Sequence, residues 1–459
     1  MMKSVLASVL VLAAASAAPA YAAERAKNVI LFIGDGMGVA TLTAARIYDG
    51  QQRGVDGASN RLSFERFPYM SLVETYSADG LVTDSAASAS AMLTGKRTLN
   101  GALGVTDKVV RGDCVSAKAA STPTLAEIAK RAGKATGVVS TAAITDATPA
   151  SLYAHTPSRQ WQSDGDLPPE AVAAGCTDIS RQMVDGPKEL QLDLMLGGGS
   201  ATFLPAEGVG KRLDGRDLIA EWKAKGGTYV DTGTALAAIP KTTRKLLGLF
   251  APGNMMRETT RQATETDAPR LVAMTTKAIE ILSQEKNGYF LVVEGGLIDK
   301  AHHINLAHEA LNETVELSQA VAAAVAMTDP KDTLIIVTAD HSHGLTLNGG
   351  ARNTPVLGLL PGNEDDPAMA MDGKPVPILM YSTGPAGPAA GETRPDLSGV
   401  DMTDPDLRMP AAVLLGSAAH TGEDIAAFAT GPGAEQLHGL QDHPAVFGIM
   451  RQALGLPAN

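Results

Sequence analysis

One serine stands beside an aspartate at the predicted start of a helix built almost wholly from small residues. The stretch covers residues 82–91 and reads Val-Thr-Asp-Ser-Ala-Ala-Ser-Ala-Ser-Ala. Either Thr83 or Asp84 can serve as the N-cap, which puts Ser85 in the first turn, where free amides and the helix dipole favour an alkoxide or a bound anion. Ser85 is therefore a candidate nucleophile, although such residues are also common at ordinary helix starts.

Carboxylate and imidazole groups are clustered elsewhere in the chain. Asp35 lies among glycines directly after a predicted strand, where glycine permits tight turns and close approach of a metal or phosphate. Glu294 follows another strand, and Asp299 and His303 come next, four residues apart. On a helix that spacing puts both side chains on one face, where they can bind one cation.

A third cluster, Asp340-His341-Ser342-His343, follows a further apolar strand. Adjacent Asp340 and His341 can turn toward one ion, while His343 could orient a ligand. With His420, the chain has enough groups for two zinc sites. Each cluster alone also fits an ordinary turn or a capped helix, but a purely structural role for all of them together is hard to sustain.

Arg159 is a candidate anion clamp. It follows the polar stretch Thr145-Asp146-Ala147-Thr148, eleven residues beyond Thr148. Its planar guanidinium group matches two oxygens of a phosphate. A lone arginine is more often a solvated or ion-paired side chain, so the assignment depends on the rest of the chain.

The elements that must position these residues alternate along the chain. Strands are predicted at residues 28–33, 135–140, 192–196, 289–293, 333–338 and 425–429. Helices are predicted at residues 123–131, 214–225, 268–284, 307–327 and 444–454. This alternation predicts an α/β fold with a central, largely parallel β-sheet flanked by helices. Acidic groups follow three of these strands, and open α/β sheets build their sites at the carboxyl ends of strands.

The N-terminus has the order of a secretory signal. Lys3 precedes an apolar run over residues 5–18, and Ala20-Tyr21-Ala22 follows. We expect a signal peptide over residues 1–22 and a periplasmic or secreted protein. The alternative, a membrane anchor, would need a longer run than these roughly 14 residues, and no later run is long enough to span a bilayer.

The charge and cysteine content narrow the choice of partners and metals. The formal net charge of −12 becomes −13 when Lys3 leaves with the signal, which disfavours nucleic acid and anionic membranes as partners. The two cysteines, Cys114 and Cys176, are expected to form a disulfide in an oxidising compartment, with two buried free thiols as the alternative. Two cysteines cannot build a thiolate zinc site, so any metal must be held by histidines and carboxylates.

Composition changes over about residues 349–410. Ten of the 26 prolines lie there, and no long periodic helix can be drawn. The segment is predicted to be an irregular insertion that projects from the core.

Taken in order, these motifs resemble those of alkaline phosphatases, and the similarity covers nearly all of the mature chain. The motifs that carry it are Gly34-Asp35-Gly36-Met37-Gly38, Thr83-Asp84-Ser85-Ala86-Ala87-Ser88, Asp146-Ala147-Thr148-Pro149-Ala150, Ser158-Arg159, Val293-Glu294-Gly295, Thr338-Ala339-Asp340-His341 and His420-Thr421-Gly422. The resemblance implies one catalytic domain over residues 23–459, in which the insertion is the crown region. It also implies a homodimer that hydrolyses phosphate monoesters through a phosphoserine.

The resemblance implies a role for each candidate residue. Ser85 would be phosphorylated, Arg159 would bind the phosphate oxygens and Lys300 would assist through water. Two zinc ions would be held, one by Asp35, Asp340 and His341, the other by Asp299, His303 and His420. One magnesium ion would be held by Asp35, Thr148 and Glu294, while Asp84, Asp146, Lys300 and His343 would support these groups. Together the ions, the four ligand carboxylates, Arg159 and a serine alkoxide give a net charge of about +2, which attracts a phosphate dianion.

The chain mixes two branches of that family. The cysteine pair and the Trp161 region resemble the animal branch, whereas Asp146 and Lys300 match the bacterial branch, where animal enzymes have histidines. Ala251 replaces a glutamate that binds calcium in the animal branch, so a calcium site is not expected.

Two alternatives remain, a related enzyme and a protein of another class. Related phosphodiesterases and sulfatases share the zinc ligands, but Asp84-Ser85 and the complete magnesium set disfavour them. A zinc-dependent phosphate-binding protein without turnover would use the same ligands and differ only in activity.

Overall fold

The computed structural model describes residues 25–457, except 265, 364 and 365. The signal peptide predicted over residues 1–22 lies outside the described residues. The central feature is a ten-stranded sheet with the strand order β13-β2-β12-β8-β1-β7-β3-β4-β6-β5. Its strands are β1 (Asn28–Gly34), β2 (Tyr69–Glu74), β3 (Ala135–Ala143), β4 (Leu194–Gly198), β5 (Thr228–Val230), β6 (Leu246–Leu249), β7 (Tyr289–Gly295), β8 (Thr333–Ala339), β12 (Ile425–Thr430) and β13 (Leu440–Asp442).

Most of this sheet is parallel. The strands from β8 to β5 in that order pair in parallel, and only β12 runs antiparallel to its neighbours β2 and β8. The α/β fold and the largely parallel sheet are therefore confirmed. All six predicted strands are present, with ends that differ by up to three residues from the prediction.

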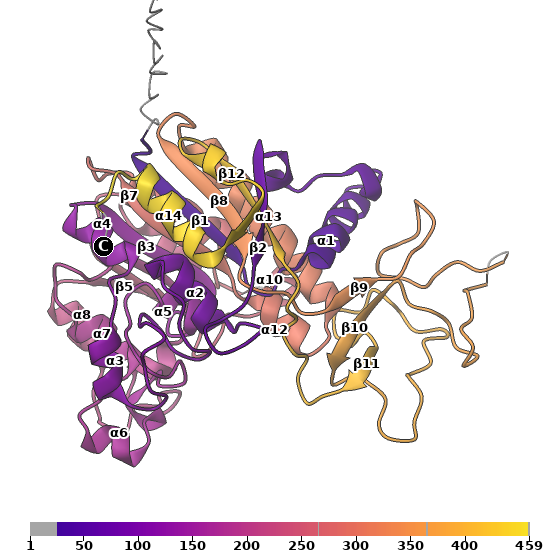
Figure 1. Ribbon diagram of the computed structural model, residues 1–459, viewed down its shortest axis with the longest axis horizontal. Helices are drawn as coiled ribbons and strands as arrows, with labels where there is room; N and C mark the ends of the chain where they lie inside the picture. Colours follow the sequence, from indigo (N-terminus) through magenta and orange to yellow (C-terminus); the bar gives the residue numbers. More distant parts are fainter. Residues whose placement is uncertain (1–24, 265, 364–365, 458–459) are drawn as a thin grey trace, which may run out of the picture.

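Helices cover the sheet in two groups. Helix α2 packs against both α4 and α14, and α13 packs against both α1 and α11. In Figure 1, α14 and α2 cross in front of the sheet. The helices are α1 (Val39–Gln52), α2 (Ser85–Thr94), α3 (Cys114–Ala120), α4 (Leu125–Arg131), α5 (Ala147–Ala150), α6 (Pro169–Ala173), α7 (Ile179–Asp185), α8 (Leu218–Ala224), α9 (Gly233–Ala238), α10 (Glu258–Ala263), α11 (Leu271–Leu282), α12 (Leu297–His303), α13 (Ala307–Met327) and α14 (His443–Ala453).

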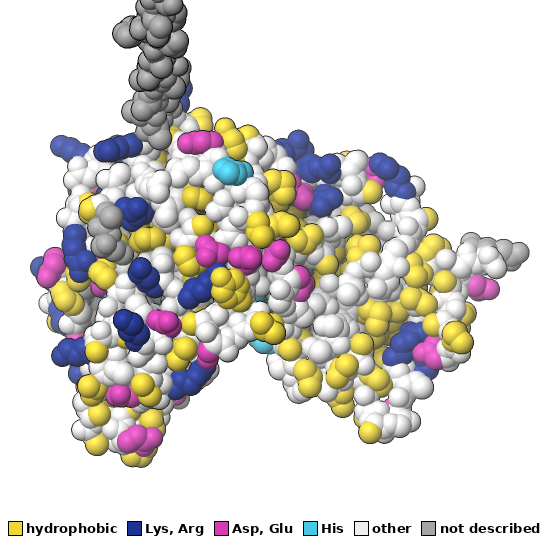
Figure 2. Space-filling model, viewed as in Figure 1, with side chains coloured by type: hydrophobic (Ala, Val, Ile, Leu, Met, Phe, Trp, Pro, Cys, Tyr) yellow, Lys and Arg dark blue, Asp and Glu magenta, His cyan; other side chains and the backbone are white. Residues whose placement is uncertain are grey.

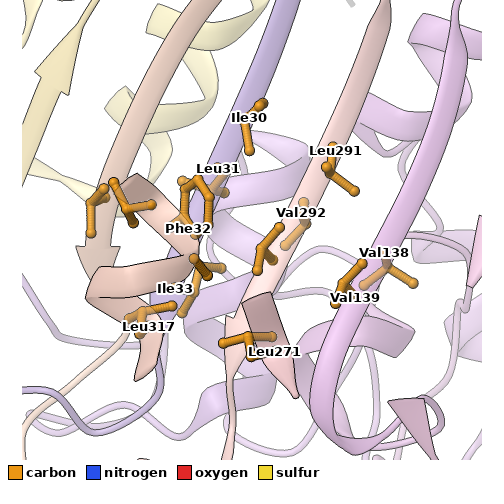
Figure 3. Close-up of a cluster of buried hydrophobic side chains, with 14 of the residues drawn as sticks. Ile30, Leu31, Phe32, Ile33, Val138, Val139, Leu271, Leu291, Val292 and Leu317 are labelled. Atoms are coloured by element: carbon orange, nitrogen blue, oxygen red, sulfur yellow. The ribbon is translucent and has the colours of Figure 1, made fainter. Parts of the chain in front are cut away.

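The core lies on both faces of the central strands. Every residue of β1, β3, β7 and β8 is buried, as expected for parallel strands with helices on both sides. Figure 3 shows Ile30, Phe32, Val139 and Val292 from neighbouring strands among the side chains of this core, with Leu271 and Leu317 from the covering helices. The buried strands fix their own carboxyl ends firmly in space.

The insertion over residues 349–410 contains no helix in its described part. It contains β10 (Leu379–Gly384), which pairs with β9 (Leu345–Leu347) and β11 (Ala411–Leu414) in a separate three-stranded sheet. Figure 1 shows this region projecting to one side of the main sheet. Figure 2 shows a hollow between this projection and the lobe that carries α3 and α6, with histidine surface at its head, close to α12.

The predicted disulfide is present. Cys114, the first residue of α3, is bonded to Cys176 with an Sγ–Sγ distance of 1.99 Å, and the described residues contain no free cysteine. Among the described helices, none combines the length and the apolar character that crossing a bilayer requires.

Candidate active site

The carboxyl ends of four neighbouring parallel strands form the floor of the site. Gly34 at the end of β1 lies opposite both Gly295 of β7 and Ala339 of β8, and Ser140 of β3 lies opposite Glu294. The acidic residues that end or follow these strands therefore leave the sheet side by side. This register explains why segments more than 250 residues apart in the sequence meet at one place.

Ser85 enters the site from α2. Of the two expected N-caps, Asp84 is the one observed: its Oδ1 accepts a hydrogen bond from the amide of Ala87 at 3.0 Å. Ser85 is consequently the first residue of the helix, and its side chain is buried. Its Oγ lies 3.3 Å from His341 Nε2 and 3.5 Å from Asp35 Oδ1, so the hydroxyl faces the predicted ligands.

Asp35, Asp340 and His341 form one group of possible metal ligands. Their donor atoms come within 4.8 Å of one another, and His341 Nε2 lies 3.2 Å from Asp340 Oδ2. The amide of Gly36 donates to Asp340 Oδ1 at 2.9 Å, which fixes that carboxylate. Gly36 has a φ of +69°, and a Cβ there would lie 2.7 Å from the ring of His343, so both the turn and the packing require glycine.

Asp299, His303 and His420 lie together beside the first group. Asp299 and His303 are both on α12, and His303 Nε2 lies 3.3 Å from Asp299 Oδ2, as the four-residue spacing predicts. His420 Nε2 lies 3.4 Å from His303 Nε2 and 3.5 Å from Asp299 Oδ1. His343 Nε2 lies 2.5 Å from the same Asp299 oxygen, so it can orient that carboxylate.

Glu294 approaches from β7 and Thr148 from the short helix α5. Both are buried, and Thr148 Oγ1 has no hydrogen-bond partner among the described residues. Glu294 accepts a short hydrogen bond from Ser140, a residue that the sequence did not single out. A buried hydroxyl without a partner beside a buried carboxylate provides the kind of oxygen donors that magnesium prefers.

Two cations complete the site. Arg159 Nη2 lies 2.8 Å from Asp146 Oδ1, and its Nη1 lies 3.1 Å from Asp84 Oδ2. Lys300 Nζ is 3.2 Å from both Asp146 and Asp299. Burial alone would lower the pKa values of Arg159 and Lys300, but Asp146 and the other nearby acids raise both above their ordinary values. Both side chains therefore stay positively charged at alkaline pH.

The buried ligand groups have perturbed protonation. Burial raises the pKa of Glu294 to about 7 and that of Asp340 to about 6. Burial and the charge of Asp299 raise the pKa of Asp35 well above its ordinary value. Burial lowers the pKa of His420 to about 4, so its ring is neutral with a lone pair available. Such crowded carboxylates and neutral imidazoles are the donor set that divalent cations bind.

The structure brings the candidate nucleophile, the cations and most of the candidate metal ligands into contact with one another. It also places two serines, to which the sequence assigned no role, in contact with ligand residues. Ser88 Oγ lies 3.4 Å from Asp340 Oδ2, and Ser417 Oγ lies 2.8 Å from His303 Nδ1. Single serines carry no distinctive sequence signal, so only their positions in the fold identify them.

Comparisons with known proteins find similarity to one family over nearly the whole chain. Residues 26–456 match the family model described as alkaline phosphatase. The tissue-nonspecific alkaline phosphatase isozyme of Gallus gallus is 41% identical over 435 residues, which cover 91% of this chain and 82% of that protein. An alkaline phosphatase of Gadus morhua is 39% identical and covers 91% of this chain and 90% of that protein.

Solved structures show the same similarity. The Thermus thermophilus alkaline phosphatase superposes with a TM-score of 0.69 at 26% identity, covering 95% of this chain and 93% of that one. A variant of the TAB5 alkaline phosphatase with Mg bound in its M3 site superposes with a TM-score of 0.66 at 26% identity, covering 95% of this chain and all of that one.

Proposed function

This chain belongs to the alkaline phosphatase family, whose reaction is the hydrolysis of phosphate monoesters, and we propose that Ser85 is the residue that becomes phosphorylated. The support is its position at the N-terminus of α2, with Oγ facing His341 and Asp35. The first-turn amides of a helix favour the alkoxide that attacks phosphorus. The attack forms the phosphoserine, breaks the ester P–O bond and releases the alcohol. Water then hydrolyses the phosphoserine, which regenerates Ser85 and releases phosphate.

Arg159 and Lys300 are the proposed phosphate-binding cations. Asp84 and Asp146 hold the two ends of the Arg159 guanidinium, which leaves its remaining N–H groups free to donate to two phosphate oxygens. Lys300 contributes a second positive charge beside Asp146 and assists phosphate through water. With two zinc ions and one magnesium ion bound as well, these two cations would make the site positively charged, so it would attract an anionic substrate although the chain has a formal charge of −12.

The ligand groups fit two zinc ions and one magnesium ion. Asp35, Asp340 and His341 would hold one zinc ion. Asp299, His303 and His420, whose donor atoms lie 3.3–3.5 Å apart, would hold the other, since both sets combine carboxylate and imidazole. Asp35, Glu294 and the unpartnered Thr148 hydroxyl would hold magnesium, which prefers oxygen ligands. When bound, these ions supply Lewis-acid stabilisation of the attacking and leaving oxygens.

Four further residues orient or neutralise the metal ligands and the Arg159 guanidinium. Asp84 and Asp146 orient Arg159, and His343 orients Asp299 through the 2.5 Å contact. Lys300 balances the charge of Asp146 and Asp299. No calcium site is proposed, because the animal-branch glutamate is replaced by Ala251, whose carbonyl accepts hydrogen bonds from the amides of Gly199 and Ser200.

The mature protein is proposed to be one catalytic domain over residues 23–459 that acts in the periplasm or outside the cell. The disulfide supports an oxidising compartment. A homodimer is proposed as well. The small sheet ends in the edge strand β11, where Val413 and Leu414 are exposed, and a second copy of the chain could cover them.

The test combines substrates with one substitution. The parent enzyme should hydrolyse p-nitrophenyl phosphate much faster than bis(p-nitrophenyl) phosphate or p-nitrophenyl sulfate, and a chelator should abolish this activity. Ser85→Ala should retain the fold and the zinc but lose most turnover, because only one oxygen is removed. Near-parent rates for Ser85→Ala, with no phosphoserine trapped at Ser85 in the parent, would disprove the assignment. A preference for the diester or the sulfate would point to the related hydrolases, and phosphate binding without turnover to a binding protein.

A further inference from the structure

Arg159 lies in a segment with very little regular structure to hold it. Residues 151–163 contain neither helix nor strand. Before the arginine, the segment is fixed by the bridge between Thr156 and Leu103. The Arg159 amide itself donates to the carbonyl of Gly101 at 2.7 Å. These contacts fix the chain on one side of the guanidinium only.

Trp161 fixes the chain on the other side. Its carbonyl accepts a hydrogen bond from the amide of Ile179 at 2.8 Å, which joins the segment to the start of α7. Trp161 is only 4% exposed, although Arg159 and Gln162 beside it are half-buried and Gln160 is exposed. A buried tryptophan removes roughly 150–250 Å² of surface from solvent, so it is the largest single anchor of this loop.

The disulfide is the surface against which Trp161 packs. Trp161, Ala171 and Cys176 form a small hydrophobic cluster that is separate from the main core, and Cys114 and Leu167 pack against it. The bond between Cys114 and Cys176 links α3 to the residues that follow α6. A cavity of about 620 Å³ adjoins the cluster and is lined by both cysteines, Trp161 and residues 155–157. The segment that carries Arg159 therefore has space into which it can shift if the cluster is loosened.

We propose that Trp161, braced by the Cys114–Cys176 disulfide, is a positioning residue that holds the Arg159 guanidinium at its phosphate-binding angle. This inference rests on the role of Arg159 given under Proposed function. Displacement of a positioning group by about 1 Å can cost on the order of 100-fold in rate. Weaker packing of Trp161 beside the disulfide should therefore lower the rate by a measurable factor. The disulfide thereby contributes to phosphate affinity as well as to stability.

The test is a double-mutant cycle between Trp161 and Arg159. Trp161→Ala should raise the inhibition constant of inorganic phosphate and lower kcat/KM for p-nitrophenyl phosphate, each by roughly tenfold, with zinc content unchanged. In an Arg159→Ala background the same change should have almost no further effect. Trp161→Phe and the double variant Cys114→Ser with Cys176→Ser should show the same pattern, with a factor of about three. If Trp161→Ala does not fold, these milder variants test the same inference.

Trp222 provides a matched control. It is the only other tryptophan in the chain, it is also buried, and its Nε1 donates to the carbonyl of Thr228, the first residue of β5. Trp222→Phe should leave the phosphate inhibition constant unchanged. The inference is overturned if Trp161→Ala changes the phosphate inhibition constant and kcat/KM by the same factor in the parent and in the Arg159→Ala background. It is also overturned if the phosphate inhibition constant is unchanged in the Trp161 variants. If Arg159→Ala itself leaves phosphate binding unchanged, the proposed role of Arg159 fails first.

Discussion

Replacing Asp84 by Asn and, separately, by Ala should separate its two structural tasks. Asp84 Oδ1 accepts hydrogen bonds from the amides of Ala87 and Gly101, both at 3.0 Å, and thus caps α2. Asp84 Oδ2 lies 3.1 Å from Arg159 Nη1. Asp84→Asn retains an oxygen for the amides but loses the charge, whereas Asp84→Ala loses both.

The expected magnitudes follow from these contacts. Loss of an N-cap costs about 1 kcal/mol, and the amide of Gly101 left without a partner adds about 1 kcal/mol. Asp84→Ala should therefore destabilise the protein by about 2 kcal/mol, and Asp84→Asn by less than about 1 kcal/mol. Arg159 keeps its contact with Asp146 in both variants. The phosphate inhibition constant should consequently rise only severalfold, by an amount similar in the two variants.

Denaturant unfolding followed by circular dichroism, with zinc and magnesium at saturation, measures the change in stability. Competitive inhibition of p-nitrophenyl phosphate hydrolysis by inorganic phosphate measures the change in the phosphate inhibition constant. The reasoning is refuted if Asp84→Asn destabilises as much as Asp84→Ala, because the charge and not the cap would then dominate. It is also refuted if neither variant alters phosphate inhibition.

Further predictions concern the metals, the supporting residues and pH. His420→Ala should lower the zinc content, measured by elemental analysis, from about two equivalents to about one, because a three-ligand site that loses one ligand binds far more weakly. Full zinc retention would place His420 outside the metal site. Asp146→His combined with Lys300→His removes both charges that face each other at 3.2 Å. The phosphate inhibition constant at pH 10 and the magnesium requirement should therefore both change. Changes below about twofold in both would contradict the roles proposed for Asp146 and Lys300. Burial raises the pKa of Glu313 on α13 to about 8 from an ordinary value of 4.5, so its contribution to stability is complete below pH 4.5 and is lost as pH rises through 8. Glu313→Gln should therefore raise the unfolding midpoint relative to the parent at pH 9 but not at pH 5, and an equal shift at both pH values would show that Glu313 does not titrate in this range.

Several parts of the fold were predictable because their signals are local. The central strands β1, β7 and β8 are continuous apolar runs, and the helix α13 was predicted at its observed bounds. Strands β5 and β13 were missed because each has only three residues, too few for periodicity to be read. Strand β10 was missed in the proline-rich insertion, because its pairing with β9 and β11 depends on residues outside that segment.

The sequence by itself determined the chemistry that is possible. It contains Ser85 beside a capping aspartate, Asp299 and His303 four residues apart, and an acidic residue after each of several buried strands. Their order along the chain was sufficient to identify the family. Two cysteines, together with the predicted export signal, were sufficient to predict the disulfide.

Only the tertiary structure decided which groups share a site and what supports them. The parallel register of β8, β1, β7 and β3 brings Asp35, Glu294 and Asp340 to one edge, and no local pattern encodes that pairing. The same is true of Arg159, whose two carboxylate partners lie 13 and 75 residues away. The packing of Trp161 on the disulfide is likewise a long-range contact. Such contacts depend on the whole folded chain, because close approach in space is independent of separation along the sequence.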